Sequence, residues 1–260
     1  MKEDEKRFPI FHVPHDGEQF PEELMDSVCI SQSRFFRYHE EMRDIMVRQM
    51  IPENYRNAEQ AVIFPISRLL CDVERFIGPE EVMEHYGMGF CYEKAYDGTV
   101  IKKLSEDIRE KTLVYYHKHH DRIDRICAQH RRILLVDLHS YSDEIVPRDF
   151  LQQGIDTPDI CIGTDSFFTP DLLTSFTEEK FRSAGYSTNL NYPYSGCFIP
   201  DTVLSGESDC DLVSVMIEVN KRVYLDKVNN PDCVQVLEIS NLIRNIADYW
   251  MTTERLSSGI

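Results

Sequence analysis

The sequence of this chain predicts an α/β protein with a layered sheet, and three observations support that class. Short apolar runs, typical of buried strands, alternate along the chain with segments of helical periodicity. The 260 residues are 42% hydrophobic and 28% charged, which supplies enough apolar side chains for one full core. No Gly/Ser-rich or Pro-rich stretch marks a linker. We therefore expect residues 1–260 to form a single domain.

Six short apolar runs are predicted as strands, and the segments between several of them as helices. The strands are expected near residues 10–13, 61–64, 133–136, 160–163, 187–190 and 213–217. The clearest helix spans about residues 105–131, with Ser105 as an N-cap ahead of an acidic first turn. Shorter helices are predicted at 33–50, 170–184 and 240–252.

Charge and composition exclude several classes of partner. The formal net charge of −17 opposes binding to nucleic acid or anionic lipid, because such binding needs Lys and Arg against phosphate. No apolar run approaches the roughly 18 residues of a membrane span, and the first residues show no apolar leader segment. The eight cysteines lack metal-ligand spacing, so we expect reduced thiols packed as small hydrophobes. These features predict a cytoplasmic protein without nucleic-acid or membrane partners and leave its oligomeric state open.

Two histidines stand just beyond predicted strands. His15 follows the apolar run 8–13, and His139 follows the run 133–136. Ligands of open α/β sheets bind at the carboxyl ends of the strands, so both imidazoles are expected at one site. A catalytic zinc ion takes three N or O ligands and keeps one position open for water, which it activates. We predict that His15 and His139 bind one Zn²⁺ ion, the alternative being that each merely caps neighbouring backbone groups.

Spacing leaves the third metal ligand open among three residues. Glu18 forms a His-x-x-Glu unit with His15, whereas His39 and Glu40 lie on the helix predicted after the first loop. A carboxylate or an imidazole would each satisfy zinc.

A proton shuttle is predicted at Glu218, directly after the apolar run 213–217. A lone carboxylate at the end of a buried strand is costly unless it is paired or protonated, as a general base can be. The alternative is a salt bridge to Arg222, four residues further on.

Two arginines and one helical histidine complete the predicted chemistry. Arg68 and Arg75 flank Asp72, and a guanidinium fork suits a substrate carboxylate or an oxyanion, although either arginine could simply pair with Asp72. Tyr116 and His120 share one helix face at i, i+4 spacing, and we predict a catalytic role for His120.

One further acidic residue is expected to support a metal ligand. Asp137 precedes His139 by two residues and so points to the same side of the strand, where it could orient the imidazole.

Six short motifs follow one another along the chain. They are Pro14-His15-x-Gly17 with Pro21, Ser67-Arg68-x-x-x-Asp72-x-x-Arg75, Tyr116-x-x-x-His120, Asp137-x-His139-Ser140, Gly163-Thr-Asp165 and Glu218-x-x-x-Arg222-x-Tyr224. In this order they resemble the N-formylglutamate amidohydrolase family, over about residues 8–225. The resemblance implies a three-layer α/β sandwich with a mixed, mostly parallel sheet, of the zinc-dependent exopeptidase (phosphorylase/hydrolase-like) architecture. It also implies hydrolysis of a C–N amide bond.

The resemblance assigns both metal-binding histidines to His15 and His139. It implies an acidic third ligand at the start of the helix after the first loop, which falls at His39 or Glu40. We choose Glu40 and keep His39 and Glu18 as alternatives.

The substrate loop departs from the family pattern. The pattern has a basic, Gly-Gly-containing segment after an Asn, but residues 189–200 contain neither Lys nor Arg. We predict that Asn189 and Tyr194 bind substrate together with Arg68 and Arg75. The expected substrate is a small N-formyl or N-acyl amino acid similar to N-formylglutamate. Two alternatives stay open: a carboxypeptidase-like zinc peptidase, and a non-catalytic binding protein on the same scaffold.

Overall fold

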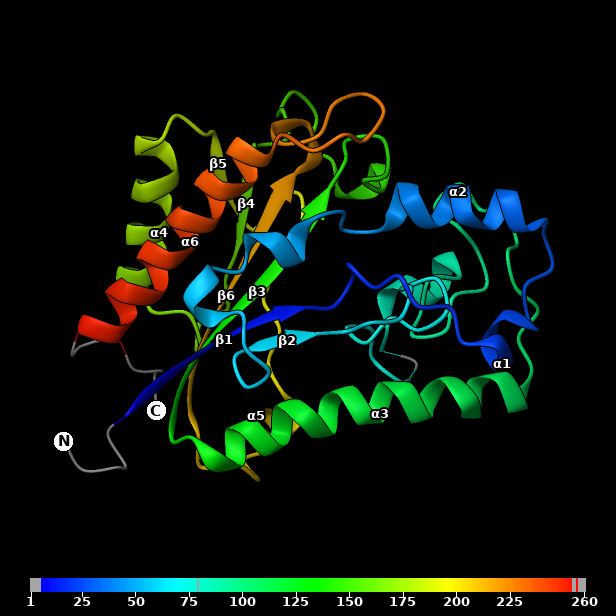
Figure 1. The fold of residues 1–260 in the computed structure, drawn as a ribbon, viewed down its shortest axis with the longest axis horizontal. Coiled ribbons are helices and arrows are strands. Elements are labelled where there is room, and N and C mark those ends of the chain that lie inside the picture. The colour runs from blue at the N-terminus through cyan, green and yellow to red at the C-terminus, as the bar shows by residue number, and fades with distance from the viewer. Residues whose placement is uncertain (1–5, 79, 254–255, 257–260) are drawn as a thin grey trace. The chain divides into compact units, whose positions relative to one another are not determined.

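The computed structural model describes residues 6–78, 80–253 and 256 and contains one six-stranded sheet (Figure 1). The strand order is β2-β1-β3-β6-β4-β5. The strands β1, β3 and β6 run parallel, β4 is antiparallel to β6, and β5 is parallel to β4. The sheet is therefore mixed and mostly parallel, as predicted. The strands are β1 (Arg7–Val13), β2 (Ala61–Ile63), β3 (Arg132–Tyr141), β4 (Ile160–Gly163), β5 (Thr188–Leu190) and β6 (Asp211–Asn220).

Helices cover both faces of this sheet. Figure 1 shows α4 and α6 on one side, and α5 with the last residues of α3 on the other. The α-helices are α1 (Glu22–Met25), α2 (Gln32–Met42), α3 (Glu106–Gln129), α4 (Asp171–Ser183), α5 (Asp201–Leu204) and α6 (Cys233–Thr252). Every residue of β1 and β4 is buried, as expected for strands covered on both faces. No helix in the described part of the chain is long and apolar enough to cross a bilayer.

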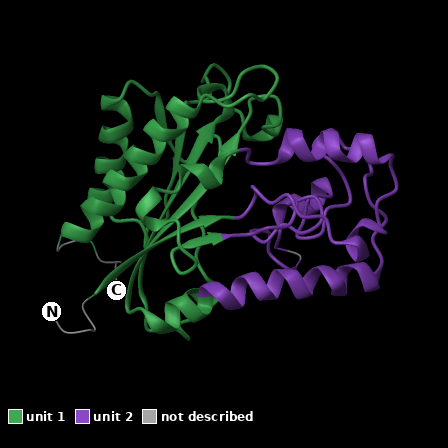
Figure 2. Cartoon of the chain, viewed as in Figure 1, with its two compact units in different colours: residues 1–13, 46–62, 124–260 green, residues 14–45, 63–123 purple. Residues whose placement is uncertain are grey.

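The chain forms two compact units that interleave along the sequence (Figure 2). Unit 1 comprises residues 1–13, 46–62 and 124–260 and carries the sheet, and unit 2 comprises residues 14–45 and 63–123. The chain passes from one unit to the other after Val13, Ile45, Val62 and Ile123. A single domain over residues 1–260 stays a prediction.

Two strands are longer than the apolar runs that predicted them. β3 continues from Val136 through Tyr141, and β6 continues from Ile217 through Asn220. The two strands pair in parallel over ten positions, so backbone hydrogen bonding carries both past their apolar halves. His139 and Glu218 consequently lie inside the sheet, where they face each other in register, and not beyond the strand ends.

The helix predicted at 33–50 is two elements. α2 ends at Met42, and a 3₁₀ helix, η2, covers Val47–Met50. Arg43 is extended and Met46 has a left-handed φ of 67°, so the segment between the helices cannot be helical. The prediction was wrong here because no Gly or Pro marks the break in the sequence.

Of the two longest helices, α3 was predicted with nearly its observed bounds, whereas α6 is longer than predicted. α3 is confirmed, and the backbone N–H of Ile108 donates to Ser105 Oγ at 3.2 Å, as expected for the N-cap. α6 begins at Cys233, before the predicted Ser240, because the side chain of Asp232 caps its first turn. All eight cysteines are free, as predicted, and five of them are buried.

Candidate functional site

The loop that carries His15 leaves β1 and is held by a close backbone contact inside unit 2. A Cβ atom on Gly17 would lie 2.2 Å from the carbonyl oxygen of Ile66, so only glycine permits this approach. Backbone hydrogen bonds from Gln19 N to Pro65 O and from Ser67 N to Gln19 O tie the same segments together. This contact gives the Pro-His-x-Gly pattern a physical reason and fixes the position of His15 within the unit.

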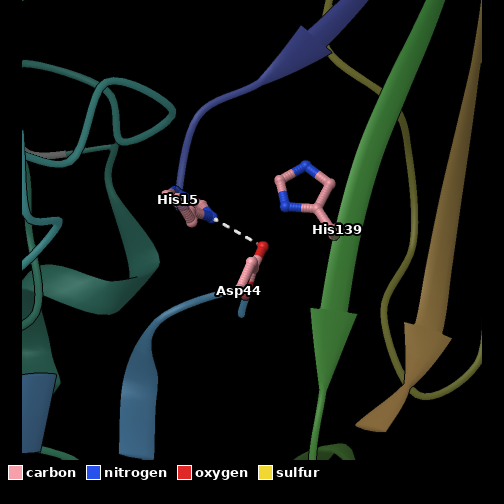
Figure 3. Close-up of side chains that lie close together, drawn as sticks. All are labelled: His15, Asp44 and His139. Carbon is pink, nitrogen blue, oxygen red and sulfur yellow. Dashed lines mark ion pairs between the residues drawn. The ribbon is translucent and has the colours of Figure 1, made fainter. Parts of the chain in front are cut away.

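His15 is buried and touches two carboxylates of its own unit. Its Nε2 lies 2.8 Å from Asp72 Oδ1, and its Nδ1 lies 3.7 Å from Asp44 Oδ2. Figure 3 shows the His15–Asp44 pair. Because an ionised carboxylate can only accept, the neutral ring carries its proton on Nε2 and presents the Nδ1 lone pair. Burial and Arg68 lower the pKa of His15, but the carboxylates of Asp72 and Asp44 outweigh them and raise it above its ordinary value.

Asp72 is the centre of a buried charge network in unit 2. Its Oδ2 accepts from Arg68 Nη2 and from Tyr92 Oη, both at 2.9 Å, and lies 3.6 Å from Arg75 Nε. Burial raises the pKa of Asp72, but His15, Arg68 and Arg75 hold it well below its usual range. Asp72 thus orients the His15 ring and partly neutralises Arg68 and Arg75. The sequence analysis had considered Asp72 only as a pairing partner of these two arginines.

Removing that charge should destabilise the fold. We expect Asp72→Asn to lower the free energy of unfolding by about 3–5 kcal/mol, because it leaves buried guanidinium groups uncompensated. Denaturant titration of the variant against wild type measures the loss. The exposed Asp97→Asn serves as a matched control, and an equal midpoint for wild type and Asp72→Asn would contradict the network's structural role.

Each predicted third ligand has another partner in unit 2. Glu18 pairs with Arg43, and Glu40, half exposed, lies 3.4 Å from Arg43 Nη2. His39 shares a 2.9 Å hydrogen bond between its Nδ1 and Ser67 Oγ. The choice of Glu40 stays a prediction, but Asp44, which the sequence analysis did not consider, is the acidic residue next to Nδ1 of His15.

Asp44 escaped sequence analysis because it was placed inside a helix. The structure instead puts it on the extended segment after α2, where its backbone N–H donates to His15 O at 3.0 Å. Its side chain is 1% exposed. A lone carboxylate between the apolar residues Met42 and Ile45 is the one signal that could have pointed to it.

In unit 1, His139 lies in a buried group on one face of β1 and β3. Asp137 Oδ1 lies 2.9 Å from His12 Nδ1 and 3.1 Å from His139 Nε2, and Asp137 Oδ2 accepts from Phe198 N at 3.1 Å. Burial raises the pKa of Asp137, but His139 and His12 hold it well below its usual range. In its neutral form, His139 therefore carries its proton on Nε2 and presents Nδ1, the same arrangement as His15. The predicted orienting role of Asp137 fits this geometry, and His12 is a contact that the sequence analysis missed.

Glu218 lies opposite His139 on the neighbouring strand and is 7% exposed. Cys161 of β4 faces Glu218 in register, and Asn189 of β5 faces Cys161. Since paired residues of adjacent strands point to the same side, these side chains form one row across the sheet. The sequence analysis offered a salt bridge between Glu218 and Arg222 as the alternative. In the structure, Arg222 forms salt bridges with Asp143 and Asp159. Burial and Glu218 raise the pKa of the Cys161 thiol to about 12, which keeps it protonated and unsuited as a nucleophile.

Tyr194 packs beside this row within unit 1. Its ring lies edge-on to those of Tyr141 and Phe150, and its carbonyl oxygen accepts from Cys161 Sγ at 3.1 Å. Tyr194 packs against an apolar cluster that includes Val146 and Met216.

His120 supports the segment that carries Arg75. Its Nε2 lies 2.8 Å from Val73 O, and Tyr116, stacked on its ring at 4.2 Å, donates to Arg75 O at 3.0 Å. Tyr116 and His120 therefore lie on the same face of α3, as predicted. The Tyr116 hydroxyl and His120 Nε2 each form a hydrogen bond with a backbone carbonyl group. The catalytic role of His120 stays a prediction, and the contacts seen here fit a residue that positions the backbone before Arg75.

Comparison with known proteins agrees with this geometry. The family model described as N-formylglutamate amidohydrolase matches residues 9–225. The chain belongs to this family. Membership supports a hydrolase that acts on amide bonds. No curated protein matches the chain in sequence.

Solved structures show the same fold. N-formylglutamate amidohydrolase from Ralstonia eutropha JMP134 superposes with a TM-score of 0.73 at 17% identity, over 95% of this chain and 95% of that one. A gene product of Agrobacterium tumefaciens superposes with a TM-score of 0.63 at 17% identity, over 93% of this chain and 91% of that one. The α/β architecture predicted from the motifs is thus confirmed along nearly the whole chain.

Proposed function

We propose that the protein is a metal-dependent amidohydrolase that cleaves the C–N amide bond of an N-formyl or N-acyl amino acid, with N-formylglutamate as the reference substrate. The observation that carries the proposal is a repeated arrangement in the two units. In each, a buried aspartate holds Nε2 of a motif histidine, His15 in unit 2 and His139 in unit 1. Carboxylates that orient ligand imidazoles in this way are typical of catalytic metal sites. Family membership supplies the reaction class.

The metal is proposed to be one Zn²⁺ ion held by His15, Asp44 and His139. The three side chains offer two imidazole nitrogens and one carboxylate, and all three are buried. That donor set matches catalytic zinc, which binds three such ligands and leaves one position for water or substrate. A zinc ion bound here would polarise the scissile carbonyl group and make water more acidic.

The remaining roles follow from the chemistry of amide hydrolysis. Water adds to the carbonyl carbon, the C–N bond breaks, and the products are a carboxylate and an amine. Glu218 would accept the proton of the attacking water and deliver it to the leaving nitrogen. This role needs a carboxylate that is shielded from bulk water, as Glu218 is.

Arg75 is proposed to bind the substrate's α-carboxylate. Its side chain is 25% exposed, and its Nε makes no hydrogen bond within the described residues, being 3.6 Å from Asp72. A guanidinium group whose Nε forms no hydrogen bond still has N–H groups that can donate to a substrate. Arginine typically binds a carboxylate through two parallel hydrogen bonds. Arg68, Asn189 and Tyr194 are proposed to line the same substrate site.

Metal analysis combined with an amidase assay tests this function. We expect about one zinc ion per chain after purification, release of formate from N-formylglutamate, loss of activity on chelation and recovery with zinc. Unchanged turnover in a demonstrably metal-free sample would contradict the metal dependence. Failure to cleave any formyl or acyl amino acid after zinc restoration would contradict the activity. Trimming of peptides in the same sample would favour a peptidase, and binding without turnover would favour a binding protein.

A further inference from the structure

Unit 2 buries a lysine for which the described residues supply no carboxylate. Lys102 is 1% exposed, and its Nζ donates to Leu70 O at 3.2 Å and contacts Cys91 Sγ at 3.6 Å. Buried charges are normally paired with an opposite charge, since desolvation is otherwise costly. Burial lowers the pKa of Lys102, and the nearby thiols Cys91 and Cys71 oppose this shift only in part. The amine and the thiol of this pair therefore meet in an environment shielded from water.

A second thiol lies in the same cluster. Cys91 Sγ is 3.4 Å from Thr112 Oγ1, and Cys71 Sγ is 3.9 Å from Thr112 O. Burial and Asp72 raise the pKa of Cys71 well above its ordinary value, so Cys71 stays a thiol. The geometry favours Cys91 as the oxidised partner of Lys102, because the Lys102 amine is in contact with its sulfur and can attack it once it is oxidised.

We propose that Cys91 and Lys102 form a peroxide-responsive covalent site, in which oxidation of Cys91 ends in a sulfenamide bond between Cys91 Sγ and Lys102 Nζ. The pair is already in contact, and the amine has no carboxylate among the described residues that would hold it away. The proposal concerns unit 2 alone and does not depend on the amidohydrolase activity.

The chemistry balances in two steps. The Cys91 sulfur attacks one oxygen of hydrogen peroxide, the O–O bond breaks, and the thiol proton leaves with the other oxygen as one water molecule, which leaves a sulfenic acid beside the Lys102 amine. The Nζ lone pair then attacks the sulfur, the S–O bond breaks, and the hydroxyl group leaves with one amine proton as a second water. Cysteine sulfur is oxidised by two electrons and peroxide is reduced by two. An added thiol cleaves the S–N bond and returns the amine.

The bond would form one residue away from the buried charge network of Asp72. Cys91 is followed by Tyr92, whose hydroxyl donates to Asp72 at 2.9 Å. Closing a 3.6 Å contact into a covalent bond pulls on the backbone next to Tyr92. We therefore expect oxidation to disturb the Tyr92–Asp72 hydrogen bond.

Peptide mapping of the full chain tests the proposal. After graded exposure to hydrogen peroxide and digestion under non-reducing conditions, mass spectrometry should find the Cys91 and Lys102 peptides joined, lighter by two hydrogen atoms than their sum. Dithiothreitol should separate them. Small oxidants reach such buried groups through local opening, so the joined fraction should rise with exposure time.

Matched variants assign the bond. Cys91→Ser and Lys102→Met should abolish the joined peptide, whereas Cys71→Ser and the exposed neighbour Lys103→Met should retain it. A Cys71–Cys91 disulfide in the wild-type map would overturn the proposal. So would an unmodified Cys91 under conditions that fully oxidise the exposed Cys29 and Cys233. Both of these contradicting results would be measured on the wild-type protein, so neither requires that a variant folds.

Discussion

Replacing Glu218 with Gln is expected to lower kcat for amide hydrolysis by about 10²–10⁴-fold, the usual contribution of a positioned general base. Gln keeps the size of the side chain but cannot accept the proton of the attacking water. Since Glu218 is not a proposed ligand, zinc content should stay at the wild-type level. Steady-state kinetics with N-formylglutamate and metal analysis of the same sample measure both quantities.

The exposed Glu144→Gln is a matched control, because it removes one carboxylate of the same size and charge from unit 1. Its kcat should equal that of wild type. An unchanged kcat in Glu218→Gln would remove Glu218 from proton transfer, and loss of zinc in that variant would make it a ligand instead.

Replacing Asp44 with Asn is expected to weaken zinc binding by more than about 100-fold, beyond the 10–100-fold typical of residues that only orient a ligand. The amide keeps the shape of the side chain but is a much poorer donor to zinc than a carboxylate. Zinc content after dialysis against a graded chelator measures the change, and hydrolysis should fall in parallel.

Glu40→Gln, Glu18→Gln and His39→Gln form the matched set for Asp44→Asn. Each removes a residue that sequence spacing had favoured as the third ligand. All three should keep wild-type zinc content. Retention of zinc in Asp44→Asn together with its loss in Glu40→Gln would reverse the assignment.

The sequence predicted the sheet and the two histidines because these features are local. An apolar run followed by Pro-His-x-Gly indicates a strand and a loop without knowledge of the rest of the chain. The ends of β3 and β6 were not predicted, because the polar residues Asp137, His139 and Glu218 are part of strands only by virtue of their neighbours. The hydrophobic periodicity of a segment reflects that segment alone, whereas the pairing of two strands depends on the sequences of both.

The acidic residues around the histidines were harder to predict for the same reason. Asp44 contacts His15 through a break after α2 that no Gly or Pro marks, and Asp72 contacts it across 57 positions of sequence. The motif containing Asp72 was found, but its pattern suggested arginine pairing, and the contact with His15 depends on how two loops fold together. Residues that hold a ligand in place show no spacing rule, so only the structure of each unit identifies them.

Anomalous scattering at the zinc absorption edge from crystals of the protein tests most directly whether His15, Asp44 and His139 share one zinc ion, as proposed. We expect one strong peak bonded to a nitrogen of each histidine and to an oxygen of Asp44, at about 2.0–2.2 Å. A peak bonded to only one of the two histidines, or no peak in a zinc-supplemented crystal of active protein, would contradict it.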